Sequence, residues 1–133
     1  MAFLLDTNIC SYVIKQKPAN VYTRLLRTTP AEVFVSVITV YELFTGCEKS
    51  SKRERLLQEV RKFLWPFSLI SFSEQHAFRA ASLRASLEKA GTPIGPYDLL
   101  LAAQALVEDL VLVTNNTREF QRVDKLQLED WTK

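Results

Sequence analysis

Phe3-Leu4-Leu5-Asp6-Thr7-Asn8 is the stretch of sequence that decides the fold. Three consecutive apolar residues are typical of a strand buried on both faces, and such strands belong to parallel sheets. An acid that follows such a strand directly, ahead of a polar turn, suits a functional site better than a core, because a buried charge is costly. The stretch therefore predicts a buried parallel strand with an acid at its carboxyl end.

The rest of the chain alternates strand patterns with helix patterns. Apolar or β-branched runs predict further strands at residues 33–38, 67–72 and 110–114, and apolar residues at helical spacing predict helices at residues 56–64, 77–90 and 99–106. We expect Thr39 to be an N-cap, Gly91 to be the C-cap of its helix and Pro96 to be a first helical residue. This alternation predicts right-handed crossovers and a three-layer α/β sandwich around a parallel sheet.

The composition is that of one ordinary globular domain over residues 1–133. Hydrophobic residues make up 47% and charged residues 24%, with only 3 Gly and 5 Pro, and no linker or repeat interrupts the chain. No apolar run approaches the roughly 20 residues that a membrane helix needs, and the first residues do not resemble a signal peptide. We therefore expect no membrane span and a cytoplasmic protein, with Cys10 and Cys47 as free thiols.

Four acids fall where strands end or helices begin in this prediction. They are Asp6, Glu42, Asp98 and Glu119. Ligands of open α/β sheets bind outside the carboxyl ends of the strands, so we expect these acids to converge there. Two carboxylates about 4 Å apart repel by roughly 4 kcal/mol at an effective dielectric near 20. Either shared protons or a hard cation must neutralise them, and oxygen ligands alone favour Mg²⁺ or Mn²⁺.

Three of the four acids also have a structural explanation. Glu42 stands three residues after Thr39, the spacing of a capping box, and Asp98 lies in a first helical turn, where the helix dipole favours any acid. Glu119 could be a solvated acid beside Arg118 and Arg122. For each of these residues taken alone, the structural and the functional explanation both stay open.

Other catalytic chemistries find little support in the sequence. His76 is the only histidine, and its apolar helical surroundings predict a packed or surface residue. A ribonuclease that uses paired histidines as acid and base therefore cannot be built from this chain. No Gly-rich phosphate loop of the Walker type and no Gly-x-Ser-x-Gly elbow occurs. What remains is carboxylate and metal chemistry.

Several short motifs, taken in order, resemble the conserved blocks of VapC-type PIN-domain toxins. They are Leu5-Asp6-Thr7-Asn8, Tyr41-Glu42-Leu43, Pro93-Ile94-Gly95-Pro96-Tyr97-Asp98 with Ala102-Ala103, Val113-Thr114-Asn115-Asn116-Thr117-Arg118-Glu119-Phe120, and Leu128-Glu129-Asp130-Trp131. The resemblance spans essentially the whole chain. It implies a PIN-like α/β/α sandwich and endoribonuclease activity, often on tRNA.

The resemblance also implies roles for individual residues. Asp6, Glu42 and Asp98 match the three acidic metal-site positions. Many PIN domains carry an aspartate where this chain has Asn116, so Glu119 would supply the fourth carboxylate. The hydroxyls of Thr7 and Thr114 would orient the acids or bind water. Four further polar residues would contact phosphate or support the site, namely Asn8, Asn115, Asn116 and Arg118.

The resemblance also implies three partners, which are an RNA, a VapB-type antitoxin that covers the acids, and a second copy of the chain. Lys15, Lys17 and the basic run at residues 49–55 could guide tRNA, and the antitoxin could lie against residues 9–14 and the helix ending at Trp65. Two other function classes stay open. One is a non-catalytic PIN-like binding module, and the other is a carboxylate–metal phosphoesterase or deoxyribonuclease.

Overall fold

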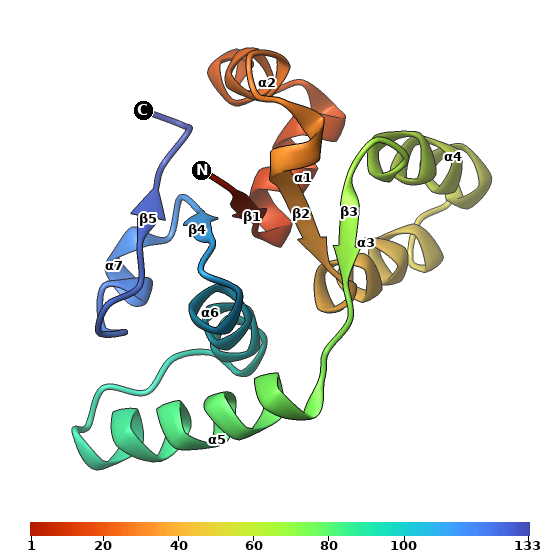
Figure 1. Cartoon of the computed structure of the whole chain (residues 1–133). Helices are drawn as coiled ribbons and strands as arrows, with labels where there is room; N and C mark the ends of the chain where they lie inside the picture. The colour runs from red at the N-terminus through yellow and green to blue at the C-terminus, as the bar shows by residue number, and fades with distance from the viewer.

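A parallel sheet forms the centre of the molecule in the computed structural model, which describes all residues 1–133 (Figure 1). Its five strands are β1 (Phe3–Leu5), β2 (Val33–Ser36), β3 (Ser68–Ile70), β4 (Val111–Val113) and β5 (Leu128–Glu129), in the order β3-β2-β1-β4-β5. Every neighbouring pair is parallel. In the central strand, Leu4 lies in register with Phe34 on one side and with Leu112 on the other.

Helices connect all the strands and cover the sheet. They are α1 (Thr7–Lys15), α2 (Ala19–Leu26), α3 (Val37–Glu48), α4 (Arg53–Leu64), α5 (Glu74–Lys89), α6 (Pro96–Glu108) and α7 (Thr117–Phe120), with a short 3-10 turn, η1, at Pro30–Glu32. None of them is long and apolar enough to cross a membrane. The patterns predicted the helices α4, α5 and α6, whereas α1, α2 and β5 carry too few periodic residues for such a prediction.

The two faces of the sheet pack against different helices, as the alternation of side chains along a strand requires. Phe3 and Leu5 of β1 belong to a core with the helices α1 to α4, whereas Leu4 between them belongs to a second core with α5, α6 and α7. Figure 1 shows α1 to α4 gathered on one side of the sheet and α5 with α6 on the other. The predicted α/β/α sandwich with a parallel sheet is confirmed.

The direction of the strand order reverses between β1 and β4. From β1 the chain adds β2 and then β3 on one side, and β4 and β5 pair on the other side. At such a switch point the loops after the two strands turn away from each other and leave a crevice outside the carboxyl edge. Asp6 follows β1 and Thr114 follows β4, so both lie at this place.

Two predicted helix ends differ in detail. The expected N-cap Thr39 is wrong, because β2 already ends at Ser36, whose hydroxyl accepts the backbone N–H of Ile38 at 3.0 Å. Thr39 is instead a fully buried residue inside α3. At the end of α5, Gly91 lies one residue past the cap Ala90 with a left-handed φ of 74°, a conformation that glycine adopts without strain.

The central strand should be the most sensitive part of the core. Leu4 is fully buried, so we expect Leu4→Ala to destabilise the protein by about 2–5 kcal/mol, the range for leucine-to-alanine changes in packed cores. Leu26→Ala is the matched control, because Leu26 is 67% exposed. Urea unfolding of both variants measures the difference. Equal midpoints would contradict the tight packing of Leu4.

Candidate active site

Asp6 is the most fixed of the four acids. It is the N-cap of α1: its Oδ1 accepts the backbone N–H of Ile9 at 2.9 Å, and its own N–H donates to the carbonyl of Val113 at 3.0 Å. The Thr114 hydroxyl provides a further hydrogen bond to its carboxylate. The residue is only 5% exposed, and its hydrogen-bond partners lie in the first turn of α1 and at the end of β4. One short stretch thus ends a strand, starts a helix and holds an acid in place.

Glu42 is oriented by a pair of threonine hydroxyls. The Thr7 hydroxyl donates to Glu42 Oε1 at 2.6 Å and lies 3.3 Å from the hydroxyl of Thr39. Thr7 starts α1, whereas Thr39 and Glu42 lie three residues apart on α3, so these contacts join two helices. The capping-box explanation of Glu42 is wrong, since Ser36 and not Thr39 caps α3.

Glu119 and Asp98 meet beside Gly95. The Glu119 Oε1 atom accepts the Gly95 N–H at 2.7 Å, and its Oε2 accepts the Asn116 side-chain N–H at 2.9 Å. A Cβ at Gly95 would lie 3.6 Å from Glu119 Oε1 and 3.8 Å from Asp98 Oδ2. The two carboxyl groups are also within hydrogen-bonding reach of each other. The glycine thus leaves room for two acids from α6 and α7.

Electrostatic effects link all four acids, which we call the acidic cluster. The pKa of Asp6 is raised to about 6, chiefly by burial; the hydrogen bonds from Thr114 and Ile9 oppose this rise, and the charge of Glu42 adds to it. Burial, with the charges of Glu119, Asp6 and Glu42, raises the pKa of Asp98 to about 7. The hydrogen bond from Gly95 lowers the pKa of Glu119. Of the neighbouring pair, Asp98 therefore keeps a proton more readily than Glu119.

The supporting residues divide into two groups. Thr7, Thr114 and Asn116 contact members of the acidic cluster directly. Asn8 and Arg118 are exposed and make no side-chain hydrogen bond, and the Asn115 amide donates to the Tyr12 hydroxyl at 3.0 Å instead of reaching an acid. His76 is a packed residue away from the site, where it caps α5 and lies 2.9 Å from Glu108.

The structure adds residues that the sequence patterns did not single out. Asp130 lies near enough to Asp6 for its charge to raise the pKa of that acid. Tyr41 and Tyr97 pack edge to face beside the cluster, with ring centroids 5.8 Å apart. Each tyrosine immediately precedes an acid of the cluster, which is the one sequence signal that could have indicated them.

A groove leads away from Glu42 and Thr7 between α1, α3 and α4. Its volume is about 680 Å³, and apolar side chains such as Leu43 and Leu56 line it together with the three basic residues Lys15, Lys17 and Arg55. Of the residues at 9–14, Ile9 and Val13 are buried in the core, whereas Ser11 and the half-buried Ile14 line this groove. The groove therefore joins the acidic cluster to a basic rim.

Comparison with known proteins identifies the family to which the chain belongs. The family model of the PIN domain matches residues 3–126. The tRNA(fMet)-specific endonuclease VapC of Salmonella typhimurium is 40% identical over 131 residues, covering 98% of both chains. The protein of the same name from Shigella flexneri is 39% identical over 132 residues, covering 99% of both. The chain belongs to the PIN domain family, in its VapC group.

Solved structures agree with this assignment. The DNA-bound VapBC complex of Salmonella typhimurium contains a chain with a TM-score of 0.92 at 40% identity, covering 98% of each chain. VapBC2 of Rickettsia felis, bound to a DNA fragment from its promoter, gives a TM-score of 0.91 at 38% identity, covering 98% of this chain and 99% of that one. The resemblance to VapC-type PIN domains predicted from the motifs is confirmed.

The acidic cluster of this PIN domain should destabilise it when no cation is present. The folded protein binds the proton of Asp6 more tightly than the unfolded chain does, because the pKa is about 6 instead of its ordinary 3.8. Ionisation of Asp6 therefore lowers the free energy of unfolding. This loss of stability grows as the pH rises from 3.8 and is complete above 6. A shift of this size corresponds to about 3 kcal/mol.

We therefore expect Asp6→Asn, which keeps an oxygen for the Ile9 N–H, to melt several degrees above wild type in chelator above pH 6. The difference should shrink as the pH falls towards 3.8. Asp109→Asn is the control, because Asp109 is exposed and has a left-handed φ of 56° that asparagine tolerates. Scanning calorimetry across this pH range measures the effect, and a difference that does not vary with pH would contradict it.

Proposed function

We propose that this chain is the toxin of a VapBC toxin–antitoxin pair and acts as a metal-dependent endoribonuclease with tRNA as its substrate. The observation that carries the proposal is the acidic cluster at the switch point of the sheet, in a chain that matches VapC endonucleases over its whole length. The names of the relatives support RNA, and tRNA in particular, as the substrate. We place the protein in the cytoplasm, where tRNA is available.

The donor chemistry of the cluster fits a hard cation. Every candidate ligand is a carboxylate, while Cys10 and Cys47 are buried in the core and His76 lies elsewhere, so Mg²⁺ or Mn²⁺ suits the site better than zinc. As the side chains lie, no three acidic, histidine or cysteine groups surround one point. Asp6 and Asp98 would hold the ion, and the longer, half-buried Glu42 and Glu119 can turn towards it.

The chemistry is hydrolysis, in which a water oxygen bonds to phosphorus and a bond from phosphorus to a ribose oxygen breaks. A bound divalent cation supplies a lowered pKa for the attacking water and stabilises negative charge on the phosphate. Other residues of the chain hold the acids in place. Thr114 and the Ile9 N–H bind the Asp6 carboxylate, the Thr7 hydroxyl binds that of Glu42, and the Gly95 N–H binds that of Glu119. No covalent intermediate is needed.

Cleavage of tRNA tests the proposal. We expect purified wild-type protein to cleave tRNA with Mg²⁺ or Mn²⁺ and not with chelator, and Asp6→Asn to lose the activity by a factor of about 100 or more, because fixed acids are needed to hold the ion. Asp109→Asn is the matched control, since Asp109 precedes β4 and lies at the opposite edge of the sheet. Gel analysis of the products gives the rates.

The other outcomes separate the rival functions. Equal cleavage by wild type and Asp6→Asn would contradict the proposal. A wild-type chain that binds no Mg²⁺ or Mn²⁺ in calorimetry would favour a non-catalytic binding module. Hydrolysis of DNA or small phosphate esters at the rate of RNA would favour a different phosphoesterase or deoxyribonuclease.

The groove beside Glu42 supports two further parts of the proposal. We assign it to the C-terminal segment of a VapB-type antitoxin, because the structural neighbours are VapBC complexes and because its apolar lining and acidic end suit a peptide with an apolar stretch and a basic residue. The homodimer stays a prediction, which sedimentation of the purified chain would check.

The basic rim of the groove should contact RNA phosphates in the absence of the antitoxin. Lys15, Lys17 and Arg55 line the same groove as Glu42. We expect the double variant Lys15→Gln/Lys17→Gln to bind tRNA more weakly and with a smaller salt dependence, by about 0.7–0.9 in the slope of log K against log salt for each phosphate that the variant no longer neutralises. Filter binding at several salt concentrations measures this slope. Lys89→Gln/Lys133→Gln, which changes the same charge outside the groove, should leave the slope unchanged.

A further inference from the structure

Two exposed tyrosines stand next to the acidic cluster without any role in holding the acids. Tyr41 precedes Glu42 on α3, and Tyr97 precedes Asp98 on α6. Tyr41 is 54% exposed and Tyr97 42% exposed. An aromatic ring left in water forgoes the stability that its burial would give. Two such rings in contact at the rim of a polar site therefore indicate a surface that receives an apolar or aromatic ligand.

The geometry of the pair leaves ring faces available. The rings meet edge to face, with an interplanar angle of 66° and centroids 5.8 Å apart, and the two hydroxyls lie 3.4 Å from each other. In this arrangement each ring has at least one face that its partner ring does not cover. The contact joins α3 and α6, the helices that carry Glu42 and Asp98, so the platform lies beside these acids.

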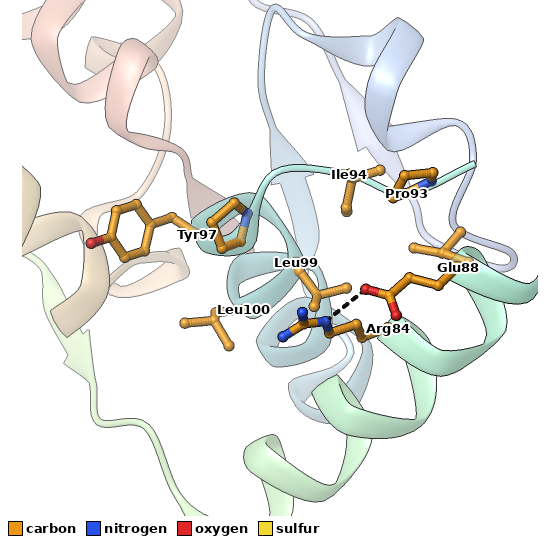
Figure 2. A pocket seen from close by; sticks show the side chains of 9 residues that line it. Arg84, Glu88, Pro93, Ile94, Tyr97, Leu99 and Leu100 are labelled. Carbon is orange, nitrogen blue, oxygen red and sulfur yellow. Dashed lines mark hydrogen bonds and ion pairs between the residues drawn. The ribbon is translucent and has the colours of Figure 1, made fainter. Parts of the chain in front are cut away.

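A neighbouring cavity offers less to a ligand. Figure 2 shows it between α5, the loop before α6 and the start of α6, with apolar lining residues that include Ile94 and Leu99 and a volume of about 310 Å³. Its charged groups satisfy each other, since Arg84 Nε donates to Glu88 at 2.9 Å. Tyr97 is one of the residues that line the cavity, but its ring is directed away from this ion pair (Figure 2). None of the four acids lines the cavity, whereas each tyrosine of the pair directly precedes one of them.

We propose that Tyr97 and Tyr41 form the stacking platform for the nucleobase next to the phosphate that the acidic cluster cleaves. The inference rests on the proposed ribonuclease function. It adds that the two tyrosines bind a base of the RNA, while the acids act on the phosphate. Unpaired bases of RNA bind proteins by stacking on aromatic side chains, and an RNA base is the planar, aromatic part of the proposed substrate. A protein segment, as the alternative ligand, would offer a planar aromatic group only where it carries an aromatic residue.

Each tyrosine lies directly before an acid of the cluster on its helix. Consecutive Cα atoms lie about 3.8 Å apart, so each tyrosine ring and the acid that follows it leave the backbone at neighbouring points. The phosphate of a nucleotide can then lie at the acids while its base, or that of its neighbour, lies on a ring. Because stacking tolerates every base, this platform requires the RNA to be single-stranded at the cleaved position without selecting its sequence. The two tyrosines are positioning residues, since the acids perform the chemistry.

Steady-state kinetics on tRNA test this assignment. We expect Tyr97→Ala to raise KM about 5-fold to 150-fold, the range that follows from loss of one stacked base, with kcat kept, and Tyr41→Ala to act in the same direction. Tyr97→Phe should keep the wild-type KM, because it keeps the ring. Trp65→Ala is the control: Trp65 is 88% exposed but precedes β3, at the amino edge of the sheet, far from the acids. The Mg²⁺-induced rise in melting temperature should be the same in all these variants.

A second measurement observes stacking without cleavage. In the Asp6→Asn background, a single-stranded RNA that carries the fluorescent base aminopurine should lose fluorescence on binding, and Tyr97→Ala should remove this quenching while Tyr97→Phe keeps it. Unchanged KM and unchanged quenching in Tyr97→Ala would overturn the platform, and so would a fall in kcat alone, which would mean that Tyr97 acts through Asp98. Absence of cleavage by wild type with normal quenching would instead overturn the ribonuclease proposal and leave the platform standing.

Discussion

The parallel pairing of β1 with both β2 and β4 is the constraint on which the rest of the structure depends. Because all three strands run in the same direction, their carboxyl ends lie at one edge, and the residues that follow them are brought together whatever their separation in sequence. Asp6 is bound to this edge at the backbone, through its N–H to the carbonyl of Val113. Asp6 could not move along the sheet without a change in the register of the central strands.

The site combines this fixed edge with mutual repulsion among its acids. Burial and neighbouring charges raise the pKa of Asp6 and Asp98, while backbone and amide donors lower that of Glu119. Neighbouring carboxylates are unfavourable in a packed core that binds no ligand, because each ionised carboxylate opposes the ionisation of the next. The arrangement is reasonable for a site that a divalent cation would neutralise, and the cost to stability is then recovered on binding.

The sequence predicted the backbone of the fold from a few strong patterns. Consecutive apolar residues at β1 and β4 and the nearly all-apolar residues 99–106 of α6 favour burial, so their place in a covered parallel sheet followed from these patterns. Sequence periodicity did not predict the shorter helices α1 and α2, because the elements that pack against them decide which of their faces are buried. Thr39 illustrates the same limit: its spacing to Glu42 matches a capping box, but the strand before it ends three residues earlier, at Ser36.

By itself, the sequence determined the α/β/α architecture and the four acids, because strand and helix periodicity and the cost of a buried charge are local properties. The tertiary structure alone decided how the acids are held: the Thr7 hydroxyl on Glu42, the Gly95 N–H on Glu119 and the contact between Tyr41 and Tyr97 join residues 35, 24 and 56 positions apart. Hydrogen bonds and ring contacts act over a few ångströms in space, and no pattern along the chain records which distant residues will come within that range.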